Sequence, residues 1–187
     1  MMIKQYQIRT KEGLLLHIRH IQDSDAPYLV DLFEHMGPES RYRRFLQPLD
    51  NPKPGLVWRE AERIAKGDPT THDGLIAFTD LPRQLDAPIA VVRYVMVEPG
   101  IAEVALSVRD DMQGQGIGTQ MMQMLAVMAR DAGVKKFVGT AQNANKAVWA
   151  VLEKLPFPMK RTPEGVNAEL EIDLTVYKKE ALKTMRA

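Results

Sequence analysis

The stretch Gln113-Gly114-Gln115-Gly116-Ile117-Gly118 joins an apolar run over residues 104–108 to a helical pattern that begins near Gly118. A strand that passes through a glycine-rich turn into a helix builds a candidate anion site. The first backbone N–H groups of the helix lack intrahelical partners, and the positive end of the helix dipole points the same way. Gly116 and Gly118 leave room for a phosphate to approach the backbone. The same turn also fits a tight strand–helix connection that binds nothing.

The spacing of this turn is Q-x-x-G-x-G, which separates it from two common nucleotide-binding motifs. It lacks the G-x-x-x-x-G-K-[ST] pattern of nucleotide-hydrolysing loops. It also lacks the last glycine of G-x-G-x-x-G, because Met121 stands at that position. The motif alone therefore predicts an anion-binding strand–turn–helix unit and does not name the ligand.

Outward from the turn, hydrophobic periodicity predicts an α/β domain with a mixed sheet and helices on both faces. Strands are expected over residues 6–10, 14–19, 74–78, 87–97, 103–108, 136–140 and 170–176. Helices are expected after a cap at Asp23 or Ser24, from Pro38 to Phe45, and over residues 56–66, 118–132 and 145–155. The strands at 103–108 and 136–140, joined by a helix, should form one parallel, right-handed βαβ unit.

The composition is that of one ordinary globular domain over residues 1–187, with 45% hydrophobic and 26% charged residues. A formal net charge of +1 favours neither nucleic acid nor an anionic membrane as a partner. The absence of cysteine excludes disulfides, thiolate metal sites and a cysteine nucleophile. No apolar run is long enough to span a bilayer, and the first residues lack the apolar core of a signal peptide, so we expect a cytoplasmic protein.

Glu103 opens the strand that leads into the turn, and alternation places Glu103, Ala105 and Ser107 on one face and Val104, Leu106 and Val108 on the other. One interpretation is an exposed carboxylate at a strand end. The other is a general base that takes a proton from an ammonium group. Partial burial would suit a carboxylate to this task by raising its pKa.

Residues 102–157, which begin A-E-V-A and end L-E-K-L-P-F, resemble the acetyl-CoA-binding half of the GNAT N-acetyltransferase superfamily. The most similar subgroup is the protein-lysine acetyltransferases, which the segment from Arg19 to Phe45 also resembles, and the resemblance covers about residues 13–175. It implies a mostly antiparallel central sheet, acetyl-CoA as acyl donor and Glu103 as the catalytic base. The cofactor-binding residues that it implies are Leu106, Ser107, Val108, Gln113, Gly114, Gln115, Gly116, Ile117, Gly118, Thr119 and Asn145.

The resemblance also gives these residues roles. The backbone of residues 106–108 should pair with the pantetheine arm, the turn should hold the pyrophosphate, and the Val108 N–H should polarise the thioester carbonyl. Asn145 matches a cofactor-contacting asparagine, although a helix cap is the alternative role for it, and Asn143 is the better candidate for that cap.

Three positions depart from the family pattern. Gln113 replaces a common arginine, so phosphate binding would rest on backbone N–H groups and the Thr119 hydroxyl. Leu152 stands where many members carry a tyrosine that protonates the leaving thiolate, so no general acid is assigned. Pro156 replaces a glycine and changes the dihedral angles open to that turn.

Other conspicuous residues have structural explanations. Met121, Met124, Leu125 and Met128 follow helical spacing, which predicts core packing. The four histidines show no metal-ligand spacing. The basic run from Arg41 to Phe45 fits a solvated helix face, a surface facing the acceptor, or, as a rival function, a nucleic-acid contact. Residues 178–187 read as a charged tail helix.

We therefore expect an acetyl-CoA-dependent N-acetyltransferase that works by direct attack, because no cysteine is present to hold an acyl group. The subgroup resemblance implies a protein lysine as acceptor. A small amine is the alternative acceptor, and a non-catalytic acyl-CoA sensor is the alternative class. We expect a monomer or homodimer, with neither nucleic acid nor a membrane as partner.

Overall fold

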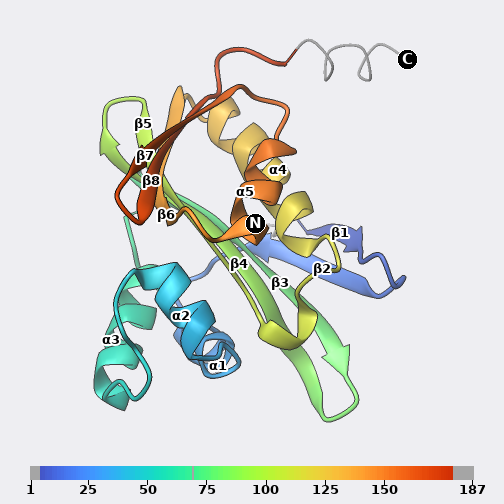
Figure 1. Cartoon of the computed structure of the whole chain (residues 1–187). Helices are drawn as coiled ribbons and strands as arrows, with labels where there is room; N and C mark the ends of the chain where they lie inside the picture. The colour runs from blue at the N-terminus through green and yellow to red at the C-terminus, as the bar shows by residue number, and fades with distance from the viewer. Residues whose placement is uncertain (1–4, 69, 179–187) are drawn as a thin grey trace.

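One eight-stranded sheet runs through the computed structural model in the order β1-β2-β3-β4-β5-β6-β8-β7 (Figure 1). The structure describes residues 5–68 and 70–178, so most of the expected tail helix at 178–187 lies outside the described residues. The strands are β1 (Tyr6–Arg9), β2 (Leu15–His20), β3 (His72–Leu81), β4 (Gln84–Glu98), β5 (Ile101–Val108), β6 (Lys136–Gln142), β7 (Met159–Glu164) and β8 (Asn167–Asp173). Every neighbouring pair is antiparallel except β5 and β6, which confirms the mixed, mostly antiparallel sheet and its parallel pair.

Helices cover both faces of the sheet, as expected (Figure 1). They are α1 (Ala26–Glu34), α2 (Pro38–Phe45), α3 (Pro54–Ala65), α4 (Ile117–Asp131) and α5 (Lys146–Glu153). One core packs α4 and α5 on the sheet and includes the fully buried Met121 and Leu125. A smaller core on the other face joins α1 and α3 to Ile76 and Phe78 of β3. The methionine spacing in α4 thus marks core packing, as predicted. No helix among the described residues is long and apolar enough to cross a membrane.

The start of α1 differs from the expectation. Asp25, not Asp23 or Ser24, occupies the N-cap position, and its side chain caps nothing. It is fully buried and accepts two hydrogen bonds from Arg19, at 2.6 and 2.8 Å, and one from the Gln22 N–H. A bidentate guanidinium stabilises a buried carboxylate more than one backbone amide does, so the Asp25 side chain pairs with Arg19 and does not cap the helix.

The C-terminal strands were only partly predicted. β8 covers Asn167–Asp173 instead of residues 170–176, because the Asp173 carboxylate accepts from the Thr175 N–H and hydroxyl and turns the chain. β7 was not assigned: it contains Pro163 and is almost entirely exposed, so it shows no hydrophobic alternation. α3 begins two residues earlier than predicted, with Pro54 in its first turn, which is a favourable place for proline.

Candidate functional site

β5 has one free edge over the half of the strand that leads into the glycine-rich turn. It pairs with β4 along its whole length but with β6 only from Ile101 to Glu103. The Arg109 N–H donates to the Ile89 carbonyl on the β4 side, so alternation turns the N–H groups of Leu106 and Val108 to the opposite side, where β6 has diverged. Residues 104–108 therefore offer strand hydrogen-bonding groups to whatever lies beside them.

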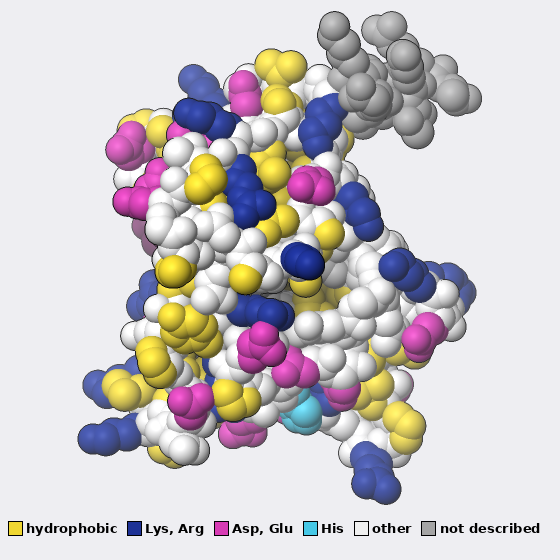
Figure 2. All heavy atoms as spheres, in the orientation of Figure 1, with side chains coloured by type: hydrophobic (Ala, Val, Ile, Leu, Met, Phe, Trp, Pro, Cys, Tyr) yellow, Lys and Arg dark blue, Asp and Glu magenta, His cyan; other side chains and the backbone are white. Residues whose placement is uncertain are grey.

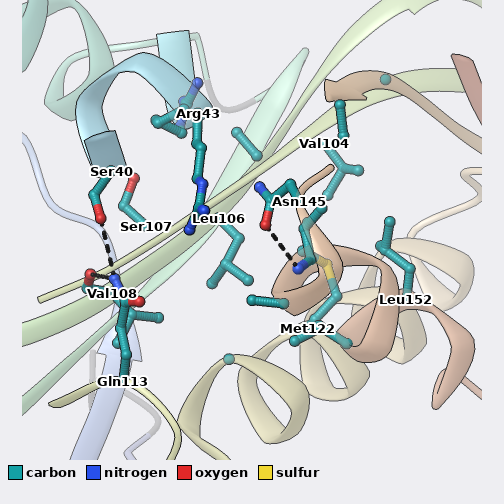
Figure 3. A pocket seen from close by; sticks show the side chains of 18 of the residues that line it. Ser40, Arg43, Val104, Leu106, Ser107, Val108, Gln113, Met122, Asn145 and Leu152 are labelled. Atoms are coloured by element: carbon teal, nitrogen blue, oxygen red, sulfur yellow. Dashed lines mark hydrogen bonds between the residues drawn. The ribbon is translucent and has the colours of Figure 1, made fainter. Parts of the chain in front are cut away.

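A pocket of about 660 Å³ opens at this free edge. Figure 3 shows how side chains from α2, among them Ser40 and Arg43, and side chains at the start and end of α5, Asn145 and Leu152, approach β5 from opposite sides. In Figure 2 the surface is hollowed between the part that carries α1–α3 and the part that carries α4 and α5, and basic side chains border the hollow. The pocket brings together almost all predicted site residues: Glu103, Leu106, Ser107, Val108, Gln113, Gly114, Gly116, Ile117, Gly118, Thr119 and Asn145.

The glycines of the turn meet two different structural requirements, one of backbone conformation and one of close packing. Gly114 and Gly116 have φ of +78° and +84°, a region that L side chains rarely adopt. Gly118 has ordinary helical backbone, but a Cβ there would lie 3.1 Å from the Leu106 Cδ2, so it lets α4 pack closely on β5. Gln120 is the first residue of α4 whose backbone N–H donates a helical hydrogen bond, and its acceptor is the Gly116 carbonyl. The N–H groups of residues 117–119 thus stay available at the pocket.

The side-chain nitrogens of the two glutamines of the turn make contacts within the protein. The Gln113 amide nitrogen lies 3.3 Å from the Val108 carbonyl, 3.0 Å from the Asp110 Oδ1 and 3.3 Å from the Ser40 hydroxyl, so it is engaged within the protein. Gln115 is the one predicted cofactor residue that does not line the pocket. Its side-chain nitrogen turns to the Met112 sulfur at 3.9 Å. Both side chains shape the turn from within.

Lys11, which sequence reasoning did not select, lies against the phosphate turn. Its backbone N–H donates to the Gln115 carbonyl at 3.0 Å, and its Nζ donates to the Gly114 carbonyl at 3.3 Å. It comes from the β1–β2 turn and lines the pocket. No local pattern could reveal this cation, because 103 residues separate it from Gly114.

Glu103 lies on the opposite wall, on the face of the sheet that α2 and α3 cover. Its side chain is exposed, so the partial burial expected of a base is absent in this structure. Arg93 of β4 pairs in register with Ala105 and so shares this face. Arg44 of α2, with Glu60 and Arg63 of α3, completes the wall.

The charged groups on this wall shift one another's pKa values. Arg63 donates two hydrogen bonds to Glu60, at 2.6 and 2.8 Å, which lower the pKa of Glu60 and raise the pKa of Arg63. Burial lowers the pKa of Arg44 to about 10, and repulsion from Arg93 acts in the same direction. Burial is also the main cause that lowers the pKa of Arg93. Two guanidinium groups are thus held at an electrostatic cost.

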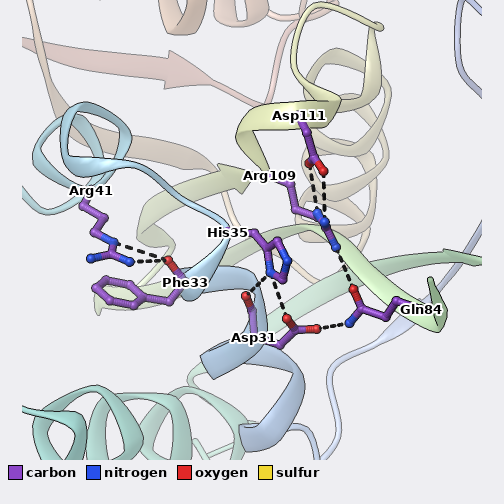
Figure 4. A network of polar contacts seen from close by, with 7 residues as sticks. All are labelled: Asp31, Phe33, His35, Arg41, Gln84, Arg109 and Asp111. Atoms are coloured by element: carbon purple, nitrogen blue, oxygen red, sulfur yellow. Dashed lines mark hydrogen bonds and ion pairs between the residues drawn. The ribbon is translucent and has the colours of Figure 1, made fainter. Parts of the chain in front are cut away.

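A polar network fixes the segment between β5 and the turn (Figure 4). The buried Arg109 donates to both Asp111 oxygens at 3.0 Å and to the Gln84 Oε1 at 3.1 Å. Gln84 in turn donates to Asp31, which also pairs with His35 at 2.9 Å. The network ties the end of α1 and the start of β4 to the 3-10 turn Asp110–Met112, and so sets where the glycine turn begins.

Asn145 performs the capping role that we preferred for Asn143. The Asn145 Oδ1 accepts from the Val148 N–H at 3.2 Å, and the residue is the N-cap of α5. Asn143 instead donates to the carbonyls of Gly165 and Asn167, across the β7–β8 turn. Asn145 nevertheless lines the pocket, so a cap and a ligand contact are compatible there.

The basic run on α2 divides between two tasks. Arg41 donates to the carbonyls of Phe33, Leu49 and Asp50 and holds the α2 region together, with its guanidinium over the Phe33 ring. Arg43 and Arg44 line the pocket. Part of the basic run therefore lies at the pocket and not on a fully solvated helix face. Leu152 is buried and also lines the pocket, so the position of the family tyrosine is apolar.

Comparison with known proteins agrees with this geometry. Residues 38–157 match the family model described as "Acetyltransferase (GNAT) family". The chain is 29% identical over 162 residues to acetyltransferase Pat of Mycolicibacterium smegmatis, an alignment that covers 86% of this chain and 46% of that protein. The chain thus spans less than half of that relative's length.

Two further comparisons cover most of both proteins. The chain is 24% identical over 154 residues to acetyltransferase PA5475 of Pseudomonas aeruginosa, which covers 82% of this chain and 80% of that protein. The crystal structure of the GNAT domain of S. lividans PAT superposes with a TM-score of 0.76 at 27% identity, covering 90% of this chain and 96% of that one.

Proposed function

The chain belongs to the acetyltransferase (GNAT) family, and on that premise we propose that it transfers the acetyl group of acetyl-CoA to an amine. The observation that carries the proposal is the free edge of β5 beside the glycine-rich turn. An extended pantetheine arm would add to this edge like a strand, with its amides on the backbone of residues 104–108. The pyrophosphate would then reach the N–H groups at the start of α4.

Positive charge for the phosphates comes, in this proposal, from Lys11. Gln113 is uncharged, and its amide nitrogen is already shared among three acceptors of the protein. The Lys11 Nζ lies 3.3 Å from the Gly114 carbonyl, at the turn itself. A charged donor there would supply the attraction that an arginine at position 113 supplies in other family members.

Glu103 is the proposed base. Its carboxylate would take a proton from the acceptor ammonium, directly or through one water, and the free amine nitrogen would attack the thioester carbon. The Val108 N–H, on the free edge, would stabilise the oxyanion of the tetrahedral intermediate. Collapse of that intermediate breaks the C–S bond, releases the coenzyme A thiolate and passes the second proton of the amine nitrogen to solvent. Leu152 offers no proton, so the thiolate would leave without a side-chain acid at that position.

The proposed acceptor is a protein lysine, which rests on the resemblance of this sequence to the protein-lysine acetyltransferase subgroup. The test measures release of free thiol from acetyl-CoA with a lysine-peptide pool and with small amines. Thiol release that depends on an acceptor supports transfer, whereas tight coenzyme A binding without release would mean a sensor.

Glu103→Gln tests the base in the same assay. The amide keeps the size of the side chain but cannot accept the proton, so turnover should fall by roughly 10²–10⁴-fold. Coenzyme A affinity should persist, because the cofactor is held further along β5 and in the turn. The loss should shrink as pH rises, since more acceptor amine is already neutral. Unchanged turnover near neutral pH would remove Glu103 from the mechanism.

A further inference from the structure

We propose that the acceptor amine carries a carboxylate close to it, and that Arg44 and Arg93 bind this carboxylate beside Glu103. The inference rests on the proposed acetyl transfer in the same pocket and names the chemistry of the acceptor. It follows from two guanidinium groups that line the pocket and have no hydrogen-bond partner in the described part of the chain.

Arg93 is fixed by the sheet. On β4 it pairs with Gly74 on one side and Ala105 on the other, so its side chain rises from the middle of the sheet. Glu103 lies on the same face, two residues before Ala105 on β5. A Cβ at Gly74 would lie 2.9 Å from the Arg93 Cβ, so glycine leaves space for the arginine stem. The Arg93 Nε is buried and donates no hydrogen bond to any described residue. A buried donor without a partner carries a desolvation penalty.

Arg44 enters the same pocket from α2. Its guanidinium carbon lies 4.9 Å from the Phe45 ring centroid, a cation–π contact that uses none of its hydrogen-bond donors. It donates no hydrogen bond to the residues at 5–68 and 70–178. Arg93 is close enough to lower the pKa of Arg44, so the two cations repel each other across the pocket.

The nearby carboxylates do not satisfy this pair. Glu60 is engaged by both hydrogen bonds from Arg63. Glu103 makes no ion pair within 4 Å among the described residues. The wall already carries the three guanidinium groups of Arg44, Arg63 and Arg93 against the two carboxylates of Glu60 and Glu103, so an ammonium acceptor alone would raise its net positive charge further. An acceptor that brings its own carboxylate would instead accept from the unpaired guanidinium donors and leave Glu103 free for the proton.

Arg93 is too far from the phosphate turn to serve the pyrophosphate. Arg93 lies level with Ala105, three residues before Val108, which is about 10 Å along an extended strand. Beyond Val108 the chain still passes through the 3-10 turn before it reaches Gly114. The phosphate end of the pocket has its own cation, Lys11.

The experiment compares three lysine peptides that differ only in the residues flanking the lysine: glutamate, glutamine or lysine. Thiol release gives kcat/KM, and calorimetry gives peptide affinity for the protein–coenzyme A complex, where no transfer occurs. We expect the glutamate peptide to be preferred by about tenfold to a hundredfold, the range for hydrogen bonds to charged groups. A small aminocarboxylate tested against the matched amine without its carboxylate shows whether a free metabolite or a peptide is the better source of this chemistry.

Arg93→Gln and Arg44→Gln should each abolish most of this preference in both assays. Arg59→Gln, which removes the same charge from an exposed site on α3, should keep it. A thermal shift with coenzyme A confirms that each variant is folded and binds the cofactor. Equal affinity for the three peptides, or a preference that survives in both pocket variants, would overturn the proposal. Absence of thiol release with every acceptor would count against the proposed transfer alone, because the binding measurement still tests the carboxylate.

Discussion

Two substitutions of Gly116 distinguish an effect on cofactor binding from an effect on the stability of the fold. Gly116 has φ +84° and caps α4, and the position of a Cβ there is open, with the Lys11 Cε at 3.7 Å and the Gln120 Nε2 at 3.9 Å. Gly116→Ala therefore costs only backbone strain, about 1–2 kcal/mol for a left-handed non-glycine residue. For a chain of this size that cost lowers the Tm by about 2–8 °C.

Gly116→Glu introduces the same backbone strain and also places a carboxylate at the turn. A unit negative charge about 4 Å from a phosphate charge near a protein surface costs about 4 kcal/mol. The new carboxylate would also pair with Lys11 and neutralise the cation at the turn. Coenzyme A at about 100 times its Kd stabilises the native state by about 2.7 kcal/mol, which is less than this repulsion. The glutamate variant should therefore lose the protection completely.

The assay is thermal unfolding of the wild type and both variants, with and without coenzyme A. We expect a ligand-induced rise of about 5–11 °C in the wild type, from about 2–4 °C per kcal/mol. The alanine variant should retain most of that rise from a lower starting Tm, and the glutamate variant should show none. A full ligand shift in the glutamate variant would refute the assignment of the turn as the phosphate site.

Three further substitutions test residues around the pocket. Lys11→Gln should weaken coenzyme A binding by about tenfold or more and Lys11→Arg should not, whereas equal affinities by calorimetry would exclude a phosphate contact. Asn145→Ala should lower the free energy of unfolding by about 1 kcal/mol because the α5 cap is lost, whereas Asn145→Asp should retain the cap and the stability. Denaturant titration measures both variants, and equal losses would contradict the capping role. Hydrogen bonds from Arg109 hold the pKa of Asp111 below its usual range. The pair therefore stabilises the fold above about pH 4, the ordinary pKa of an aspartate, and this contribution is lost as the pH falls below that value through the lowered pKa of Asp111. The Tm of Asp111→Asn should consequently fall less between pH 5 and pH 3 than that of the wild type, and parallel curves would contradict this role.

The parts of the fold that could be predicted are those whose neighbours in space are also neighbours in sequence. The strand–turn–helix unit from β5 to α4 shows alternation, then positive-φ glycines, then 3.6-residue periodicity, and each signal is local. β7 carries no such signal, because its position depends on pairing with β8 and not on burial of a face. The cap of α1 was mispredicted for a related reason: Asp25 is taken by Arg19, a residue of β2.

The same limit applies to the site. The glycine turn and Glu103 could be selected from a short stretch of chain and its family resemblance. Lys11, Arg44 and Arg93 reach the pocket from the β1–β2 turn, α2 and β4, so only the sheet register and helix packing bring them together. The sequence left both an exposed and a partly buried Glu103 open, and the structure has it exposed.

The contact between the β1–β2 turn and the glycine turn has a consequence for how the protein folds. The Lys11 N–H bonds to the Gln115 carbonyl, and the Gln120 side chain bonds to the Arg9 carbonyl, so the floor of the pocket is closed by chain segments more than 100 residues apart. Contacts of such separation must offset the entropy lost when the long intervening chain is closed, so they depend on the rest of the sheet being in place. The glycine-rich segment is thus not a transplantable module: grafted into another strand–helix junction, it would lack the hairpin that holds its carbonyls in place.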